Sequence, residues 1–452
     1  MDHTTEMLSD YSCNLSYEDL SPQVIKQVKR TLIDTLGCAA GGFLSEPGKI
    51  ARTVASSVSS DMPSRVLGTE VFTSPDMAGF ANGVMVRYLD CNDCYFSPGG
   101  GHPSDMIAAV LALADPMVAD GKEVITSIVL AYEVFCRLSD EVVTGGLGWD
   151  QGTFSIIGAA CAAGRIMGLD QDEMANAISL AVTPSLPLGV TRTGELSMWK
   201  GCATASATRS AIFAALLAGQ GMSGPSEPFE GRRGLWDQAV GQPVELNTMG
   251  GGNEPFRITD TFFKAYPAQI HTQAPTGLAL ELQHLVSPKE IKSIRIQAYQ
   301  GACSTPATEP EKWHPKTRET ADHSIPYMVA AAFIDGWVSP ASFTNQKIQD
   351  PNIRELISKI TIEENAEYTN KYPQEYNIRM EVSNNSGQSY EAKASYPKGH
   401  QNNPLSDDEL EVKFRGLSTG IWSDNQSSNA LEMLWSLEDL DGLDDVLSGL
   451  VV

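Results

Sequence analysis

The apolar residues in the first half of the chain recur every three to four positions, which is the spacing of amphipathic helices. The segment 17–42 keeps this spacing and ends in Gly-Gly, a typical helix stop. Two later segments, 154–170 and 202–221, carry long runs of Ala, Gly and Ser. Because small side chains let helices approach closely, we expect these segments to be central helices of a large helical domain. Further helical patterns occupy 122–142 and 172–182.

Beyond about residue 268 the pattern changes from helical spacing to alternation. Segments 291–299, 357–365 and 376–396 alternate apolar and polar residues, which predicts β-strands. The sequence Asn-Asn-Ser-Gly within the last segment predicts a hairpin turn. A helical pattern at 323–336 lies among these strands, so this part of the chain is expected to be α+β.

The length of the chain suggests two domains. At 452 residues it exceeds the size of one ordinary hydrophobic core. The helical pattern returns after residue 400 and continues toward the C-terminus. We therefore predict a mainly α protein with a large all-helical domain at 1–267, a smaller α+β domain at 268–400, and C-terminal helices at 401–452 that dock back onto the first domain.

The charge balance narrows the classes of partner. The chain has 32 Lys and Arg against 56 Asp and Glu, a formal net charge of −24. Nucleic acids and anionic membranes bind basic faces, so neither is expected as a partner. An acidic protein can still bind an acidic small molecule where a few cations line its pocket.

The N-terminus and the cysteines favour a cytoplasmic location. The first ten residues are acidic and lack the apolar run of a signal peptide. No uninterrupted apolar stretch reaches the roughly 18 residues of a membrane span. The eight cysteines are scattered, and several lie in Ala-rich apolar contexts. In a chain of this length, such a distribution indicates reduced and buried thiols.

The segment RYLDCNDCYFSPGGGHPS, residues 87–104, is a polar turn between two apolar helical patterns. Asp90, Asp93 and His102 fit a carboxylate–imidazole group that performs general acid–base chemistry. The alternative is a pair of Asx helix caps with a hydrogen-bonded histidine, and the density of polar groups favours the functional interpretation. Cys91 and Cys94 form a C-x-x-C without a second pair, which favours two thiols in a pocket wall over a metal or disulfide site.

Cations and histidines from later segments complete the candidate site. Lys200 follows an aromatic residue and opens a small-residue helix, where an ammonium and a helix N-terminus would form an anion site; a surface lysine is the alternative. Arg192 is a further cation in a Gly-flanked loop. His323 precedes a helical pattern and fits a capping residue and a site residue equally well. The predicted domain junction, where ligand sites are common, adds Lys264, Gln269 and His271.

Four segments resemble, in order, the MmgE/PrpD family, which includes 2-methylcitrate dehydratases and cis-aconitate decarboxylases. YLDCNDCYFSPGGGHPSD is similar to the family's L-D-F-N-D-T…G-H-P-S-D signature, and MWKGCATASATR to its lysine segment. FKAYPAQIHTQ resembles the K-x-x-P-A-x-x-H-x-Q of the dehydratase branch. ETADHSIPYMVAAAFIDG resembles the D-H-x-x-x-Y-M-V-A segment of the smaller domain. Four ordered matches are far more specific than any one of them.

The resemblance implies a large all-helical domain built from both ends of the chain, residues 1–267 plus 401–452, with the smaller α+β domain inserted at 268–400. It also implies a homodimer with a site for di- or tricarboxylic acids between the domains, needing no metal and no other cofactor. Matched position by position, Asp90 and His102 correspond to the family's acid–base residues, and His271 to the histidine of the dehydratase branch. Lys200 matches the carboxylate-binding lysine, and Lys264 the junction lysine. The predicted catalytic residues are thus Asp90, His102 and His271. The predicted substrate-binding residues are Lys200, Lys264, Arg192, Asp93, Cys94 and Gln269.

Departures from the family pattern bear on the reaction. Cys94 stands where the family usually has Thr, and Asp150 and Gln269 stand where the decarboxylase branch has histidines. The pattern favours a hydro-lyase that dehydrates a 2-hydroxy tricarboxylic acid, such as 2-methylcitrate, by β-elimination. The alternatives are a decarboxylase or epimerase of a related polycarboxylate, and a non-catalytic carboxylate-binding homologue. Which of Asp90 and His102 is the base stays open at this level.

Overall fold

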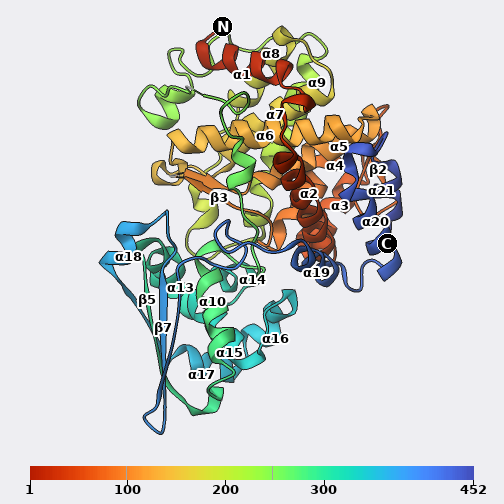
Figure 1. Cartoon of the computed structure of the whole chain (residues 1–452). Helices are drawn as coiled ribbons and strands as arrows, with labels where there is room; N and C mark the ends of the chain where they lie inside the picture. Colours follow the sequence, from red (N-terminus) through yellow and green to blue (C-terminus); the bar gives the residue numbers. More distant parts are fainter. Residues whose placement is uncertain (98, 247) are drawn as a thin grey trace.

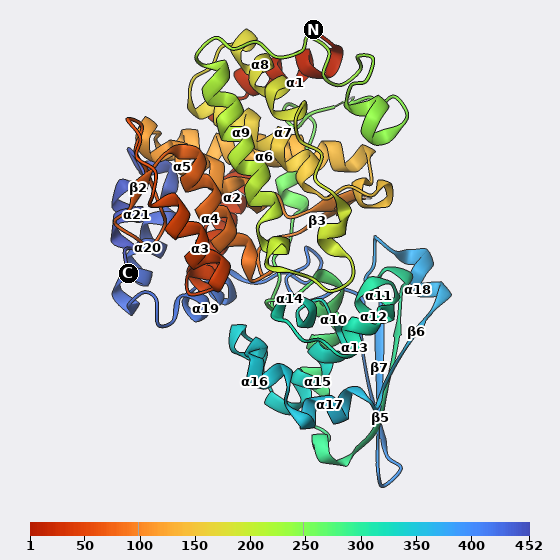
Figure 2. The ribbon, with the colours of Figure 1, turned by 180° about the vertical axis from the view of Figure 1, so that it is seen from behind.

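The computed structural model describes residues 1–97, 99–246 and 248–452. Its buried apolar residues form two large clusters. One joins residues 8–263 with 405–450, and we call this part the large lobe. The other joins residues 262–392 with Cys94, and we call it the small lobe. The small lobe lies below the large lobe in both views, with its sheet at the outer edge (Figure 1 and Figure 2). The division into two folding units at residues 267 and 400 stays a prediction.

The large lobe is built mainly of packed helices, with C-terminal helices against α2 (Figure 1). A Cβ at Gly158 of α7 would lie 2.6 Å from the carbonyl oxygen of Ala131 in α6, so these two helices touch where the sequence offers glycine. The helices are α1 (His3–Asn14), α2 (Pro22–Phe43), α3 (Glu46–Ala55), α4 (Pro75–Tyr88), α5 (Ile107–Met117), α6 (Gly121–Glu141), α7 (Gly152–Ile166), α8 (Gln171–Val182), α9 (Ala203–Ala218), α19 (Asp407–Ser418), α20 (Asp424–Trp435) and α21 (Asp444–Gly449).

The sequence had suggested an all-helical large domain, but the large lobe also contains two short strand pairs. Short strands β1 (Ser64–Arg65) and β2 (Phe72–Thr73) form one antiparallel pair, and β3 (Tyr95–Ser97) and β4 (Gly99–Gly101) form a second. The second pair occupies part of the turn predicted between α4 and α5. Gly100 has a positive φ of 148°, and a Cβ there would lie 1.9 Å from the carbonyl oxygen of Tyr95. Glycine therefore permits this close pairing of the two strands.

The small lobe contains the predicted strands. Its sheet has the order β6-β5-β7-β8, in which β5 and β6 are parallel and the other pairs are antiparallel. Alternate residues of β7 are buried, because one face of the sheet packs against α10. The strands are β5 (Ile291–Ala298), β6 (Ile360–Glu364), β7 (Ile378–Asn384) and β8 (Ser389–Ala394), and the main helices are α10 (Ile270–Leu282), α15 (Ile325–Asp335) and α17 (Pro351–Ile357).

The two segments that connect the lobes lie against each other. The backbone N–H of Phe263 donates to the carbonyl of Gly399 across 3.2 Å. Gly399 has a φ of 93°, and a Cβ there would lie 2.0 Å from the carbonyl oxygen of Phe263. The chain thus leaves and re-enters the large lobe at one place. No helix of the described residues has the length and apolar character needed to cross a bilayer.

Candidate active site

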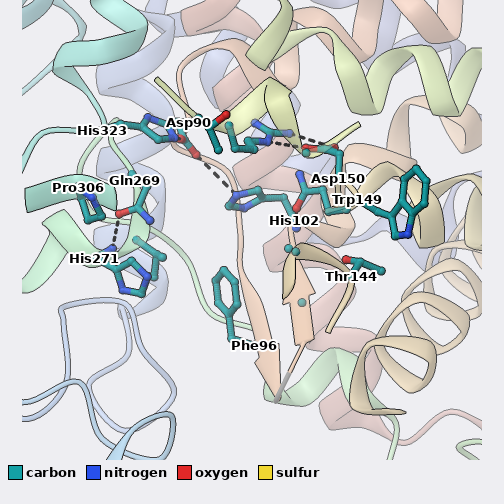
Figure 3. Close-up of a pocket in the computed structure, with 18 of the residues that line it drawn as sticks. Asp90, Phe96, His102, Thr144, Trp149, Asp150, Gln269, His271, Pro306 and His323 are labelled. Carbon is teal, nitrogen blue, oxygen red and sulfur yellow. Dashed lines mark hydrogen bonds and ion pairs between the residues drawn. The ribbon is translucent and has the colours of Figure 1, made fainter. Parts of the chain in front are cut away.

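A cavity of about 330 Å³ lies at the junction of the two lobes. The large lobe contributes the turn after α4, the β3–β4 pair and the loop before α7, and the small lobe contributes the start of α10 and the turn before α15 (Figure 3). Five of the residues predicted from the sequence line this cavity: Asp90, His102, Arg192, Gln269 and His271. Four do not line it: Asp93, Cys94, Lys200 and Lys264.

Asp90 is a buried carboxylate surrounded by cations. It follows the end of α4 and has a left-handed backbone, with φ at 54°. Its Oδ1 lies 2.6 Å from Arg87 Nη1 and also binds the ammonium of Lys264, while its Oδ2 lies 3.3 Å from Lys200 Nζ. Burial opposes ionisation, but Arg87, Lys264 and Lys200 outweigh it and hold the pKa of Asp90 well below its usual value. Asp90 is therefore a permanent negative charge at neutral pH.

His102 presents a neutral ring to the cavity. Its Nδ1 lies 2.5 Å from the backbone carbonyl oxygen of Asp93, which can only accept, so Nδ1 carries the proton. Nε2 then has the free lone pair, and it lies 3.7 Å from Asp90 Oδ1. Burial, followed by the charges of Arg87 and Lys264, holds the pKa of His102 well below its usual value. The ring can therefore accept a proton at Nε2.

Asp93 and Cys94 lie behind His102 and do not contact the cavity, contrary to the expectation that they bind substrate. The Asp93 carboxylate accepts from the hydroxyls of Ser104 at 2.6 Å and Tyr132 at 2.7 Å. Burial raises the pKa of Asp93 to about 7, against these hydrogen bonds. Cys94 Sγ lies 3.5 Å from His102 Nδ1, and burial raises the pKa of the thiol to about 12. Asp93, through its backbone carbonyl, and Cys94, through its thiol, contact the His102 ring. The Cys94 thiol is therefore buried behind the ring and does not form part of the pocket wall as predicted.

The lysines predicted to bind substrate are buried in ion pairs. Lys200 Nζ lies 2.9 Å from Asp322 Oδ2 and 3.3 Å from Asp90 Oδ2. Burial lowers the pKa of Lys200, although Asp322 and Asp90 oppose that shift. Lys264 Nζ is bound to the Asp90 carboxylate and lies 2.9 Å from the Asp90 carbonyl oxygen. Neither lysine lines the cavity, because Asp90 lies between the two ammonium groups and any ligand.

Arg192 lines the cavity but is also paired. It lies at the end of a short 3₁₀ turn, Gly189–Arg192. Its Nε lies 2.7 Å from Asp150 Oδ2, and its Nη1 donates to the carbonyl of Lys200 across 2.9 Å. Asp150, which the sequence had marked as a departure from the decarboxylase branch, is therefore the acid that orients Arg192. An anionic ligand meets this guanidinium already fixed in place.

Gln269 and His271 form the start of α10 at the cavity wall. The Gln269 side chain accepts from the backbone N–H of His271 across 2.7 Å and caps the helix. His271 Nδ1 lies 2.6 Å from the hydroxyl of Tyr299. Burial, then the charges of His323 and Lys264, lowers the pKa of His271 to about 4. The ring is thus neutral at pH 7 and faces the cavity from the small lobe.

Sequence reasoning left His323 open between a cap and a site residue and did not select Asp322, and both belong to the same group of residues. His323 lines the cavity, and Asp322 Oδ1 lies 2.6 Å from His323 Nδ1. The pair lies between α14 (Arg318–Ala321) and α15, where Ser324 caps α15. The available signal was the adjacent Asp-His before a helix. That signal cannot separate a cap from a site residue without the position of Asp90.

Asp90, Asp322 and His323 offer the atoms of a possible metal site, since their ligand atoms lie within 4.8 Å of one another. The ammonium of Lys200 already contacts both carboxylates, and that of Lys264 contacts Asp90. A divalent cation at this point would be repelled by both ammonium groups. The arrangement therefore fits an ion-pair network better than a metal site, and metal-independent chemistry stays a prediction.

Comparison with family models decides the classification. Residues 6–247 match the MmgE/PrpD N-terminal domain, and residues 266–439 match the MmgE/PrpD C-terminal domain. The chain belongs to the MmgE/PrpD family. The two matched regions lie on either side of the lobe connection near Phe263, and together they contain every residue of the cavity wall named above.

Individual relatives of this MmgE/PrpD protein carry two kinds of activity in their names. It is 26% identical over 464 residues to cis-aconitate decarboxylase of Homo sapiens, covering 97% of this chain and 92% of that protein. It is 29% identical over 380 residues to 2-methylcitrate dehydratase of Cupriavidus necator, covering 79% and 76%. It is 28% identical over 387 residues to 2-methylcitrate dehydratase of Escherichia coli (strain K12), covering 80% and 78%. The names of these relatives thus include both a decarboxylase and dehydratases.

Proposed function

We propose that this MmgE/PrpD protein is a hydro-lyase that removes water from a 2-hydroxy tricarboxylic acid, with 2-methylcitrate as the first candidate. The observation that carries the proposal is the His102 ring, whose unprotonated Nε2 faces a cavity beside the cations around Asp90. The dehydratases among its relatives support the same reaction. No step of the proposal requires a metal.

His102 acts as the base in this reaction. Its Nε2 takes the proton from the carbon next to a substrate carboxylate, and the electron pair of that C–H bond forms the new C=C bond. Negative charge grows on the neighbouring carboxylate as the proton leaves. Arg192 lines the cavity and lowers the energy of that charge, whereas Lys200 and Lys264 lie behind the wall and balance the charge of Asp90.

The hydroxyl leaves as water. The C–O bond breaks as the double bond forms, and a proton donor on the opposite wall supplies the second hydrogen of the water molecule. The products are an unsaturated tricarboxylate and water, and the proton gained by His102 restores the donor. Asp90 is held in its charged form, so it has no proton to donate, and its ion pairs with Arg87 and Lys264 make it a weak proton acceptor. Its role is to stabilise the charged groups around it.

Decarboxylation is the second candidate function. The similarity to human cis-aconitate decarboxylase extends over 97% of this chain, and that observation favours it. In that reaction a substrate carboxylate leaves as carbon dioxide and a site residue protonates the carbon. The same cation-rich cavity would bind the acid, so the two reactions differ in the bond that breaks.

The purified protein should be incubated separately with 2-methylcitrate, citrate and cis-aconitate. We expect 2-methylcitrate to yield the absorbance of a conjugated double bond and a product lighter by one water in mass spectrometry. Carbon dioxide release from cis-aconitate, without dehydration of the hydroxy acids, would favour decarboxylation. Thermal stabilisation by these acids without turnover would support a non-catalytic carboxylate-binding protein. The His102→Asn variant should lose turnover, whereas His314→Asn, at an exposed position of the small lobe, should keep it.

The homodimer and the cytoplasmic location also remain proposals, which rest on the family resemblance and on the sequence. Light scattering coupled to size-exclusion chromatography measures the mass in solution directly. A mass of about one chain would contradict the dimer.

A further inference from the structure

Two imidazole rings approach the same carboxylate from different lobes. His102 Nε2, from the large lobe, lies 3.7 Å from Asp90 Oδ1. His323 Nε2, from the small lobe, lies 3.5 Å from Asp90 Oδ2. Figure 3 shows Asp90 between the two rings, at the edge of the cavity that both rings line. A ligand in this cavity can therefore contact the two Nε2 atoms at once.

The two rings differ in what holds Nδ1. The partner of His102 is the backbone carbonyl of Asp93, which is neutral. The partner of His323 is the carboxylate of Asp322, with Nδ1 2.6 Å from Oδ1. A carboxylate stabilises an imidazolium more than a carbonyl does, because it adds an attractive charge to the hydrogen bond. Of the two rings, His323 has the better environment for carrying a second proton.

Asp90 Oδ2 supports the same assignment. This buried oxygen accepts no hydrogen bond among the described residues, although the Lys200 ammonium lies 3.3 Å away, and it faces His323 Nε2. Buried carboxylate oxygens usually accept a hydrogen bond, and a protonated His323 Nε2 would supply one to Asp90 Oδ2 in addition to its ion pair with Lys200. A protonated His323 would thus be held by Asp322 on one side and by Asp90 on the other.

The charged and titratable groups facing His323 are Asp322, Asp90, Lys200 and His271. Burial and the Lys200 ammonium lower the pKa of His323 to about 4, although Asp322 and Asp90 oppose this shift. A bound polycarboxylate adds negative charge to the cavity and raises that pKa. Substrate binding therefore favours proton uptake by His323.

We propose that His323 is the acid that protonates the leaving hydroxyl, and that Asp322 is its positioning residue. This assignment rests on the proposed dehydration. His102 Nε2 takes the proton from carbon, the C–O bond breaks, and His323 Nε2–H gives its proton to the departing oxygen, so that one molecule of water forms. The base then belongs to the large lobe and the acid to the small lobe. His271 is the competing candidate for the acid, and its Nδ1 partner is the Tyr299 hydroxyl, whose pKa burial raises well above its usual value.

A substrate whose leaving group needs no proton distinguishes the base, His102, from the acid, His323. The test compares the natural hydroxy acid with the same tricarboxylate carrying chloride in place of the hydroxyl. Chloride departs as an anion, so only the base is required. His323→Asn should lower water elimination by about 10²-fold or more and leave chloride elimination within about tenfold of the wild type. His102→Asn should lose both reactions.

Matched variants make every outcome informative. His271→Asn changes the other small-lobe imidazole of the cavity, and it should not show the selective loss of water elimination. Asp322→Asn should lower kcat for the hydroxy acid and move the alkaline limb of its pH profile to lower pH, because the His323 imidazolium loses a stabilising charge. Asp322→Glu should restore part of the rate. His323→Gln replaces His323→Asn if the latter unfolds at a lower temperature than the wild type.

Several results would overturn the assignment. Equal losses of water and chloride elimination in the His323 variants would make the residue structural. Undiminished water elimination in those variants would exclude it as the acid, and a selective loss in His271→Asn would transfer the role to His271. If the wild-type protein dehydrates none of the hydroxy acids, the proposed function itself fails, which is a different result from an active wild type with an unselective His323 variant.

Discussion

The large lobe holds its cavity imidazole with a neutral group, whereas the small lobe holds its imidazole with a charged one. His102 is oriented by a backbone carbonyl and His323 by the carboxylate of Asp322. Both rings lie at similar distances from Asp90. The difference shows how two identical side chains can take opposite parts in proton transfer, because the partner at Nδ1 decides which ring more readily carries a positive charge.

The largest effect is expected from replacing His102, whose ring is held by the Asp93 carbonyl. His102→Asn deletes the lone pair at Nε2, so elimination of both water and chloride should fall by about 10²–10⁴-fold. Steady-state rates with 2-methylcitrate measure the loss, and His314→Asn is the control. A His102→Asn variant with near wild-type rates would show that the large-lobe ring is not the base.

The next prediction removes the carboxylate that both rings share. Asp90→Asn leaves Arg87, Lys200 and Lys264 without their common acid, so the free energy of unfolding at pH 7 should fall by about 3–5 kcal/mol. The folded-state pKa of Asp90 is lowered, so its stabilisation is present at neutral pH and is lost as the pH falls below about 3.9 toward the folded-state value. Urea titrations of the variant and the wild type should therefore converge at acid pH.

The control for that measurement is Asp61→Asn, at an exposed position of the large lobe. Its unfolding free energy should stay within about 0.5 kcal/mol of the wild type. If Asp90→Asn is as stable as Asp61→Asn at pH 7, the buried ion-pair network contributes little to stability.

A smaller effect concerns the protonation of the small-lobe rings. His271 and His323 have pKa values of about 4 in the folded protein, below the ~6.5 of an exposed imidazole. The unfolded chain therefore binds more protons between these values, and stability should decrease as the pH falls from about 6.5 to about 4. His271→Asn should reduce this slope by up to about 1.4 kcal/mol per pH unit. An unchanged slope would mean that the His271 ring is already charged in the folded state.

The smallest effect is expected from replacing Cys94, which lies behind the His102 ring. Cys94 contacts Nδ1 of the ring but does not line the cavity. Cys94→Ala should therefore change kcat/KM by less than a factor of about ten, or ~1.4 kcal/mol of barrier. A larger loss, confined to KM, would return Cys94 to the substrate-binding residues that the sequence had suggested.

Much of the fold could be predicted because its signals are local. The strands of the small lobe show the alternation that β7 keeps in its buried residues. The close contact of α6 and α7 follows from glycine at position 158. The β3–β4 pair could not be predicted in this way, since three glycines have no side chains to alternate and look like an ordinary turn.

The candidate site likewise combines residues with local sequence signals and contacts that depend on the folded chain. Asp90 and His102 lie in one segment of thirteen residues, and its polar density marks them directly. The ion pair between Lys200 and Asp322 joins positions 122 residues apart, so its existence depends on how the lobes meet. For the same reason the sequence suggested free cations for a substrate, whereas the folded chain pairs each of them with its own acid.

The crossings at Phe263 and Gly399 lie side by side, so the small lobe joins the large lobe at a single place. A rigid rotation of the small lobe about this point would widen the entrance and, in the same movement, carry the acid away from the base. An opened molecule could then exchange product for fresh substrate but could not react with it. Such a rotation would couple ligand access to the assembly of the proposed proton-transfer pair.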